Sequence, residues 1–235
     1  KMKGSQLLTP FPLKIIMKTF FPNLYFALLF LITSCDGCKD PDECPDRFHI
    51  PAEIIPYKAE YHIGDTISFV SKFRYYVHEI RTDKDYNLKN INFNPNTLIN
   101  YLDTIGSSKI TNYFTMIVEN NNYKEFIFSG GSSELDGQYE LNNDTFSLRF
   151  KLIPRKIGNF LLIQKCGIGP NFGDSDFPGR CTGIGYDVIV RMNEGKDGNI
   201  EILKTSKDSL YSKLFLLNPE NNFYNKGGFC FRVVP

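Results

Sequence analysis

Apolar and polar residues alternate along most of the chain after about residue 57. The clearest run spans residues 65–77, where Ile67, Phe69 and Phe73 fall on one face and polar residues fall on the other. Alternation with a period of two over this length predicts a β-strand with one buried face. Shorter runs of the same kind occur at 114–118, 123–128, 146–152, 186–192, 200–203 and 229–233.

Three segments depart from this alternation. Residues 160–163 are continuously apolar, which predicts a strand covered on both faces. Asn94-Pro95 resembles a helix N-cap followed by proline at the first helical position, so a helix is expected over the apolar residues that follow. Ser206 could cap a second helix that ends before Pro219. Three leucines are expected on the buried face of that helix: Leu210, Leu214 and Leu217.

The strand series predicts a mainly β fold. Strands with one polar face must bury the other face on something, so an antiparallel β-sandwich with one or two short helices is expected. Immunoglobulin-like and jelly-roll-like topologies both fit the pattern. No linker interrupts the series, so residues 57–235 are predicted to form a single domain.

The amino-terminal region has the layout of an export signal. Residues 1–34 contain four lysines and no acidic residue, and the apolar run Leu24–Ile32 follows Met17 and Lys18. A basic start, a short apolar run and small residues at the exit are typical of a signal peptide. The run is shorter than the roughly 20 residues of a membrane span, although a buried core helix remains an alternative. We expect residues 1–16 to be upstream translation and residues 17–34 to be the signal.

The end of this signal resembles the lipobox of bacterial lipoproteins. Ile32-Thr33-Ser34-Cys35 has an aliphatic residue, two small residues and a cysteine, with isoleucine in place of the commoner leucine. The resemblance implies cleavage before Cys35 and a diacylglycerol on its sulfur, which together with an acyl chain on the new amino group would hold the protein on a membrane. An ordinary secreted thiol is the alternative.

The residues after Cys35 bear on which membrane is involved. The acidic start at 36–43 and the Asn-rich body are similar to surface lipoproteins of the Bacteroidota outer membrane. In enteric bacteria, Asp36 would instead resemble an inner-membrane retention signal; the outer membrane is favoured. Residues 35–56 contain four prolines and little periodicity, so they are expected to form a tether between the lipid and the domain.

Five cysteines remain after Cys35, and export favours disulfides between them. Cys38 and Cys44 are close in sequence and are expected to pair. Cys166 and Cys181 bracket a glycine- and proline-rich loop and form the second expected pair, which leaves Cys230 as a buried thiol or as a substitute member of that pair. A zinc site or a nucleophilic cysteine is disfavoured, because neither a metal-ligand spacing nor a local cysteine–histidine signature is present.

The loop between Cys166 and Cys181 is the candidate binding site. Its expected contact residues are aromatic, acidic and basic: Phe172, Asp174, Asp176, Phe177 and Arg180. Exposed aromatic and cationic side chains on a constrained loop suit recognition of a partner. The acidic oxygens are of a kind that Ca²⁺ prefers, but their spacing matches no EF-hand. A structured loop without metal or cofactor is therefore expected.

Composition and charge narrow the function classes. The proportions are those of an ordinary globular protein, and the net charge of +1 gives no electrostatic reason to expect a nucleic acid partner. No catalytic residue is identified. We expect a membrane-anchored cell-envelope lipoprotein that binds a protein or glycan partner. The alternatives are an envelope hydrolase or carbohydrate-active enzyme with two carboxylates roughly 5–10 Å apart, and a structural subunit with a large exposed apolar patch.

Overall fold

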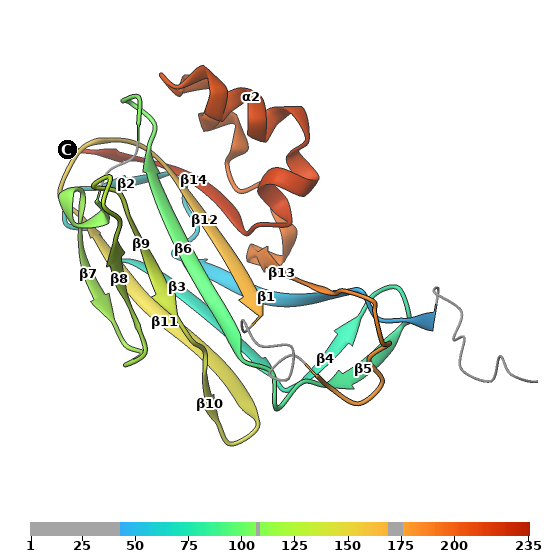
Figure 1. Cartoon of the computed structure of the whole chain (residues 1–235). Coiled ribbons are helices and arrows are strands. Elements are labelled where there is room, and N and C mark those ends of the chain that lie inside the picture. The colour runs from blue at the N-terminus through green and yellow to red at the C-terminus, as the bar shows by residue number, and fades with distance from the viewer. Residues whose placement is uncertain (1–42, 107–108, 169–175) are drawn as a thin grey trace, which may run out of the picture. The chain divides into compact units, whose positions relative to one another are not determined.

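The computed structural model describes residues 43–106, 109–168 and 176–235. The predicted signal peptide, Cys35, Cys38, Phe172 and Asp174 lie outside the described residues. The described part belongs to one unit, and it is mainly β, as the alternation predicted (Figure 1). None of the described helices is long and apolar enough to cross a membrane.

Fourteen strands and five helical elements follow one another along the described parts of the chain. The strands are β1 (Arg47–Ile55), β2 (Glu60–His62), β3 (Ile67–Arg74), β4 (Tyr76–Glu79), β5 (Lys84–Asn87), β6 (Phe93–Tyr101), β7 (Phe114–Val118), β8 (Tyr123–Ile127), β9 (Ser133–Gly137), β10 (Glu140–Asn142), β11 (Thr145–Pro154), β12 (Gly158–Ile168), β13 (Asp187–Met192) and β14 (Gly228–Val234). The helical elements are η2 (Ile110–Asn112), η4 (Asn193–Gly195), η5 (Ile200–Thr205), α2 (Ser209–Leu217) and the π-helical turn η6 (Glu220–Tyr224). Four of the helical elements lie between β13 and β14.

Strand β1 belongs to both layers of the sandwich. Its first part, from Arg47 to Ala52, pairs in parallel with β13, and its last part, from Glu53 to Ile55, pairs antiparallel with β3. The β13 layer continues through β12, β6, β9 and β8, with β14 beside the first half of β12. The β3 layer continues through β11, which also pairs with β7 and β10.

Aromatic side chains fill the space between the two layers. Phe73 of β3 meets Phe93 of β6 edge to face, with ring centroids 5.3 Å apart. Phe114 of β7 meets Phe160 of β12 at 4.9 Å in the same manner. Such pairs stabilise a core beyond the area that they bury, so a chain without tryptophan still builds a large aromatic core.

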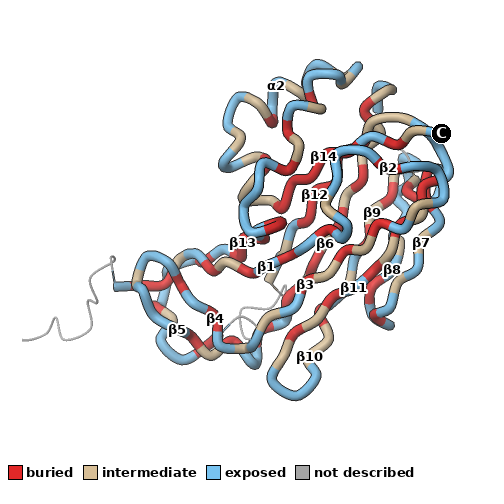
Figure 2. The backbone as a smooth tube through the Cα atoms, turned by 180° about the vertical axis from the view of Figure 1, so that it is seen from behind, coloured by how far each residue is buried: buried red, intermediate tan, exposed pale blue. Residues whose placement is uncertain are grey.

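A helical layer covers the outer face of β12 and β14 (Figure 1). Leu161 and Ile163 of β12 are buried beneath Leu203 of η5, Phe215 of α2 and Phe223 of η6. Phe160 and Leu162 point the other way, into the aromatic core. The prediction of a strand covered on both faces at 160–163 is therefore confirmed, and Figure 2 marks this stretch as buried.

Two features of the fold correct the sequence-based expectations. The β1–β13 and β14–β2 pairs are parallel, so the sandwich is not purely antiparallel. Residues 47–55, assigned to the tether, form the strand that joins the two layers, with Phe48, Ile50 and Ile54 buried. The domain thus begins before residue 57, because the buried residues of β1 alternate without a break and Pro51 falls on the exposed face.

Both predicted helices also need correction. The expected helix after Asn94-Pro95 is strand β6, in which Phe93, Pro95, Thr97 and Ile99 are buried in strict alternation. Strand β9 pairs with β6 only at Asn96 and Thr97, so Pro95 lies at a position that β9 leaves unpaired.

The second predicted helix exists as α2, but the prediction of which face it buries is wrong. The side chains of Leu214 and Leu217 are 57% and 87% exposed, whereas Phe215 is buried. The structure does not describe the Leu210 side chain.

Candidate functional site

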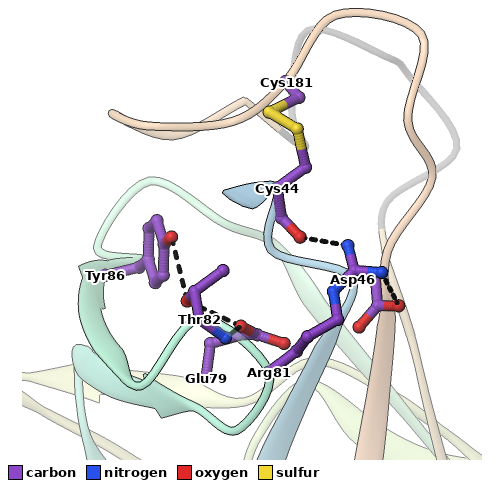
Figure 3. The surroundings of a disulfide bond; sticks show 7 residues. All are labelled: Cys44, Asp46, Glu79, Arg81, Thr82, Tyr86 and Cys181. Atoms are coloured by element: carbon purple, nitrogen blue, oxygen red, sulfur yellow. Dashed lines mark hydrogen bonds and ion pairs between the residues drawn. A yellow bond between two sulfur atoms is a disulfide. The ribbon is translucent and has the colours of Figure 1, made fainter. Parts of the chain in front are cut away.

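A disulfide joins the start of the domain to the candidate binding loop. Cys44 is bonded to Cys181 across 137 positions of sequence, with the two Cα atoms 5.7 Å apart (Figure 3). Both expected pairings are therefore wrong, since Cys44 is not free for Cys38, and Cys166 is a free thiol. The parallel pairing of β1 with β13 explains the observed bond, because it places the residues that precede the two strands side by side.

Cys166 and Cys230, the free cysteines of the described residues, are poorly suited to nucleophilic chemistry. Cys230 is buried beneath the helical layer, in agreement with its interpretation as a small core residue. Burial raises the pKa of both the Cys166 and Cys230 thiols. Since the thiolate is the nucleophilic form, a raised pKa suppresses reactivity at neutral pH.

Polar side chains hold the β4–β5 hairpin against the segment that contains Cys44 (Figure 3). Arg81 donates a hydrogen bond to the carbonyl oxygen of Cys44 and forms an ion pair with Asp46 at 3.1 Å. The buried carboxylate of Glu79 accepts hydrogen bonds from the backbone N–H and the hydroxyl of Thr82, each at 2.7 Å. Burial opposes ionisation of Glu79, but hydrogen bonds from Thr82, Arg81 and Arg47 outweigh it and lower the pKa.

Phe177 does not lie exposed on the loop, as the sequence suggested. Its ring is buried and meets the rings of Phe48, Tyr86 and Tyr186 edge to face, with centroid distances of 5.1–5.6 Å. Four aromatic residues are thus packed next to the disulfide. Sequence reasoning missed this role, because a lone phenylalanine among glycines and prolines gives no periodic signal of burial.

The other described loop residues are accessible. Asp176 is exposed, and the guanidinium of Arg180 lies 5.5 Å from the centre of the Tyr186 ring. The end of this loop and the residues that follow it line a hollow of about 540 Å³: Asp176, Arg180, Cys181, Thr182, Gly183, Ile184 and Gly185. We call this surface, with the disulfide beneath it, the disulfide corner. A polar rim on a rigid base is suited to contact with a partner.

Within the described ranges, no group of three or more histidine, cysteine or acidic side chains is arranged to hold a metal ion. Two carboxylates, Glu119 and Glu140, line a hollow of about 460 Å³ on the outer face of β11. Glu119 forms an ion pair with Lys151 at 2.9 Å, and this hydrogen bond and charge lower its pKa. A glycosidase acid needs a raised pKa, so Glu119 is poorly suited to that role.

A second surface feature was not anticipated from the sequence. A groove of about 310 Å³ lies where β1, β12 and β13 meet the segment after η6. Its lining includes three cationic side chains from three distant segments, Arg47, Lys165 and Lys226, and a single carboxylate, Asp187. We call it the basic groove. No sequence motif marks it, because the topology alone brings these segments together.

Comparisons with known proteins add little to this geometry. The chain matches no protein-family model and no curated protein sequence. Among solved structures, a fragment of the human F-spondin reeler domain covers 55% of this chain and 85% of its own, with 7% identity and a TM-score of 0.32.

Two further structural matches are of the same kind. AvmM, which catalyses macrocyclization in alchivemycin A biosynthesis, covers 60% of this chain and 84% of its own at 14% identity and a TM-score of 0.31. A type II cohesin domain from the cellulosome of Acetivibrio cellulolyticus covers 60% and 92% at 10% identity and a TM-score of 0.25. With all three scores below 0.5, the matches carry no conclusion about function.

Proposed function

We propose that this chain is an exported cell-envelope lipoprotein, anchored through Cys35, that binds a protein or glycan partner at the disulfide corner. The Cys44–Cys181 disulfide is the observation that carries the proposal. Disulfides of this kind persist in oxidising compartments and are rare in the cytosol. The bond therefore supports export independently of the signal-like sequence at residues 17–34.

The geometry of the corner supports binding rather than chemistry. The disulfide and the ring contacts of Phe177 fix the C-terminal end of the loop before any partner arrives. Preorganisation of this kind lowers the entropic cost of binding. Cys44 follows Cys35 by nine residues, so an extended connection would keep the corner within about 30 Å of a lipid on Cys35.

Two measurements test the anchor. Mass spectrometry of the protein isolated from cell membranes is expected to show a chain that begins at a diacylglyceryl-modified Cys35. The variant Cys35→Ser is expected to leave the membrane fraction, whereas Cys166→Ser, which removes an unbonded thiol, is expected to remain there. A free thiol at position 35 together with an uncut leader contradicts the anchor.

Site-specific photo-crosslinking in intact cells tests the binding surface. A crosslinker at Ile184, in the corner, is expected to capture a defined protein or glycan partner. A crosslinker at Lys213, exposed on α2, serves as the matched control. It is expected not to capture the partner that is captured at Ile184. Equal capture at both positions contradicts the corner as the binding surface. Turnover of an envelope glycan by the purified chain would favour the hydrolase alternative.

A further inference from the structure

The basic groove brings together three cationic side chains. Among the described residues, none of Arg47, Lys165 and Lys226 forms an ion pair with a carboxylate. Asp187 is the one acidic side chain in the lining, so three positive charges face one negative charge. Like charges that converge without partners repel one another, and an anion that enters the groove relieves the repulsion.

Strand register fixes two of these cations on one outer face. Arg47 lies beside Asp187 in the parallel β1–β13 pair, and the next pair along, Phe48 and Val188, is buried on the opposite face. Cys166 lies opposite Val188 in the antiparallel β12–β13 pair, so Lys165 alternates back to the exposed side. The two cations therefore lie on rigid strands, where a binding group is held more precisely than on a loop.

The third cation comes from a tight turn. The backbone of Lys226 bridges to Val190 of β13, and Gly227 follows with a φ of +54°. A Cβ on Gly227 would lie 2.8 Å from the carbonyl oxygen of Gln164, so only glycine allows this close approach. The turn thus brings Lys226 against the edge of the groove, together with the amides of Asn221 and Asn225.

Arg191 adds a further positive charge beside the groove, next to His49. His49 follows Arg47 by two positions on β1, and its Nδ1 lies 3.5 Å from Nη1 of Arg191. Burial is the main cause that lowers the pKa of His49, followed by the charges of Arg191 and Arg47. The carboxylates of Glu220 and Glu79 act in the opposite direction but more weakly.

We propose that the basic groove binds a phosphate group, either free as a phosphomonoester or borne by a lipid headgroup. A phosphomonoester carries close to two negative charges at neutral pH and offers three acceptor oxygens. A planar guanidinium, two ammonium groups and two amide donors match that charge and that number of acceptors better than they match a single carboxylate. Arg47 is twelve residues after Cys35, so an anchored chain could reach either source.

Opposite effects of two charge-changing variants test the site. Calorimetric titration of the full chain with inorganic phosphate, at pH 8 in nonionic detergent and at fixed ionic strength, is expected to show saturable binding. Lys165→Gln is expected to weaken binding about three- to ten-fold, and Asp187→Asn to tighten it by a similar factor, since each changes one nearby charge. Lys72→Gln makes the same charge change on the outer face of the other layer and is expected to have no effect.

Vesicles distinguish the two sources of phosphate. If the phosphate is lipid-borne, the Cys35→Ser chain is expected to sediment with vesicles that contain phosphatidic acid, and Lys165→Gln to release it. If the phosphate is free, soluble phosphate is bound but phosphatidic acid adds nothing over phosphatidylcholine. Because this chain lacks the proposed anchor, the result is independent of Cys35 lipidation. Absence of both forms of binding, or equal effects of Lys165→Gln and Lys72→Gln, overturns the proposal.

Discussion

The sulfur atoms of Cys44 and Cys181 join the first described turn of the domain to the loop before β13, 137 positions later in the chain. A crosslink of this span removes much of the conformational freedom of the unfolded chain. The variant Cys44→Ser is expected to lose about 2–5 kcal/mol of unfolding free energy, measured by denaturant unfolding. Cys181→Ser should behave in the same way.

A reducing agent provides the internal control for this prediction. Reduction is expected to destabilise the native chain to the level of Cys44→Ser and to leave Cys44→Ser itself unchanged. The free thiols of Cys166 and Cys230 do not contribute to either result, since neither is bonded. If native and reduced chains unfold at the same denaturant concentration, the bond does not stabilise the domain.

The carboxylate of Glu79 gives a prediction about acid stability. Hydrogen bonds to a buried charged group contribute about 1.5–3 kcal/mol, so Glu79→Gln is expected to lose an amount of that order at pH 7. The lowered pKa means that the folded state favours the ionised form. This contribution is present above the unfolded-state pKa of about 4.3 and is lost as the pH falls through the lower folded-state pKa.

The difference in unfolding free energy between the native chain and Glu79→Gln is therefore expected to vanish at acidic pH. Unfolding free energies of the native chain and of Glu79→Gln, measured from pH 7 to pH 3, should converge at the low end. Glu119→Gln is the control, because its exposed ion pair with Lys151 is expected to leave the unfolding midpoint unchanged. A constant difference between the native chain and Glu79→Gln over this range rules out the assigned role.

A buried polar network runs along the inner face of one layer, across β12, β6 and β8. The hydroxyl of Thr97 hydrogen-bonds both the hydroxyl of Tyr123 and the side-chain carbonyl of Gln164, and all three residues are buried. Thr97→Val keeps the shape but leaves two buried polar groups without this partner, so a loss of about 2–4 kcal/mol is expected. Tyr123→Phe keeps the bond between Thr97 and Gln164 and should lose less. Equal losses in the two variants would contradict this network.

The sequence predicted secondary structure best where the alternation of apolar and polar residues was not contradicted by a second local signal. Strand β11 alternates without interruption, and its residues occupy the expected faces. In β6, the local N-cap and proline signals pointed to a helix, yet burial of Phe93 and Ile99 against the opposite sheet decided the outcome. Local propensity is weak compared with the burial of a complete face, so such conflicts resolve in favour of packing.

The candidate sites were less accessible to sequence reasoning, because they depend on pairing between distant strands. Proximity in sequence favoured a bond between Cys166 and Cys181, whereas the parallel β1–β13 pair brought Cys44 to Cys181. The basic groove has the same origin, since Arg47 and Lys226 are neighbours only in the folded chain. Neither arrangement leaves a trace in local spacing.

Helix α2 offers a direct test of which face is buried. Phe215 packs against Phe223 of η6, with ring centroids 6.4 Å apart, and its ring is almost fully buried. Phe215→Ala is expected to cost about 3–5 kcal/mol, because it removes a large buried side chain and leaves a cavity. Leu217→Ala, at a side chain that is 87% exposed, is expected to change stability by no more than about 0.5 kcal/mol. Thermal and denaturant unfolding of both variants measure the contrast. A larger loss of stability in Leu217→Ala than in Phe215→Ala would contradict this assignment. It would mean that the predicted leucine face is the buried one and that α2 is rotated differently against β12 and β14.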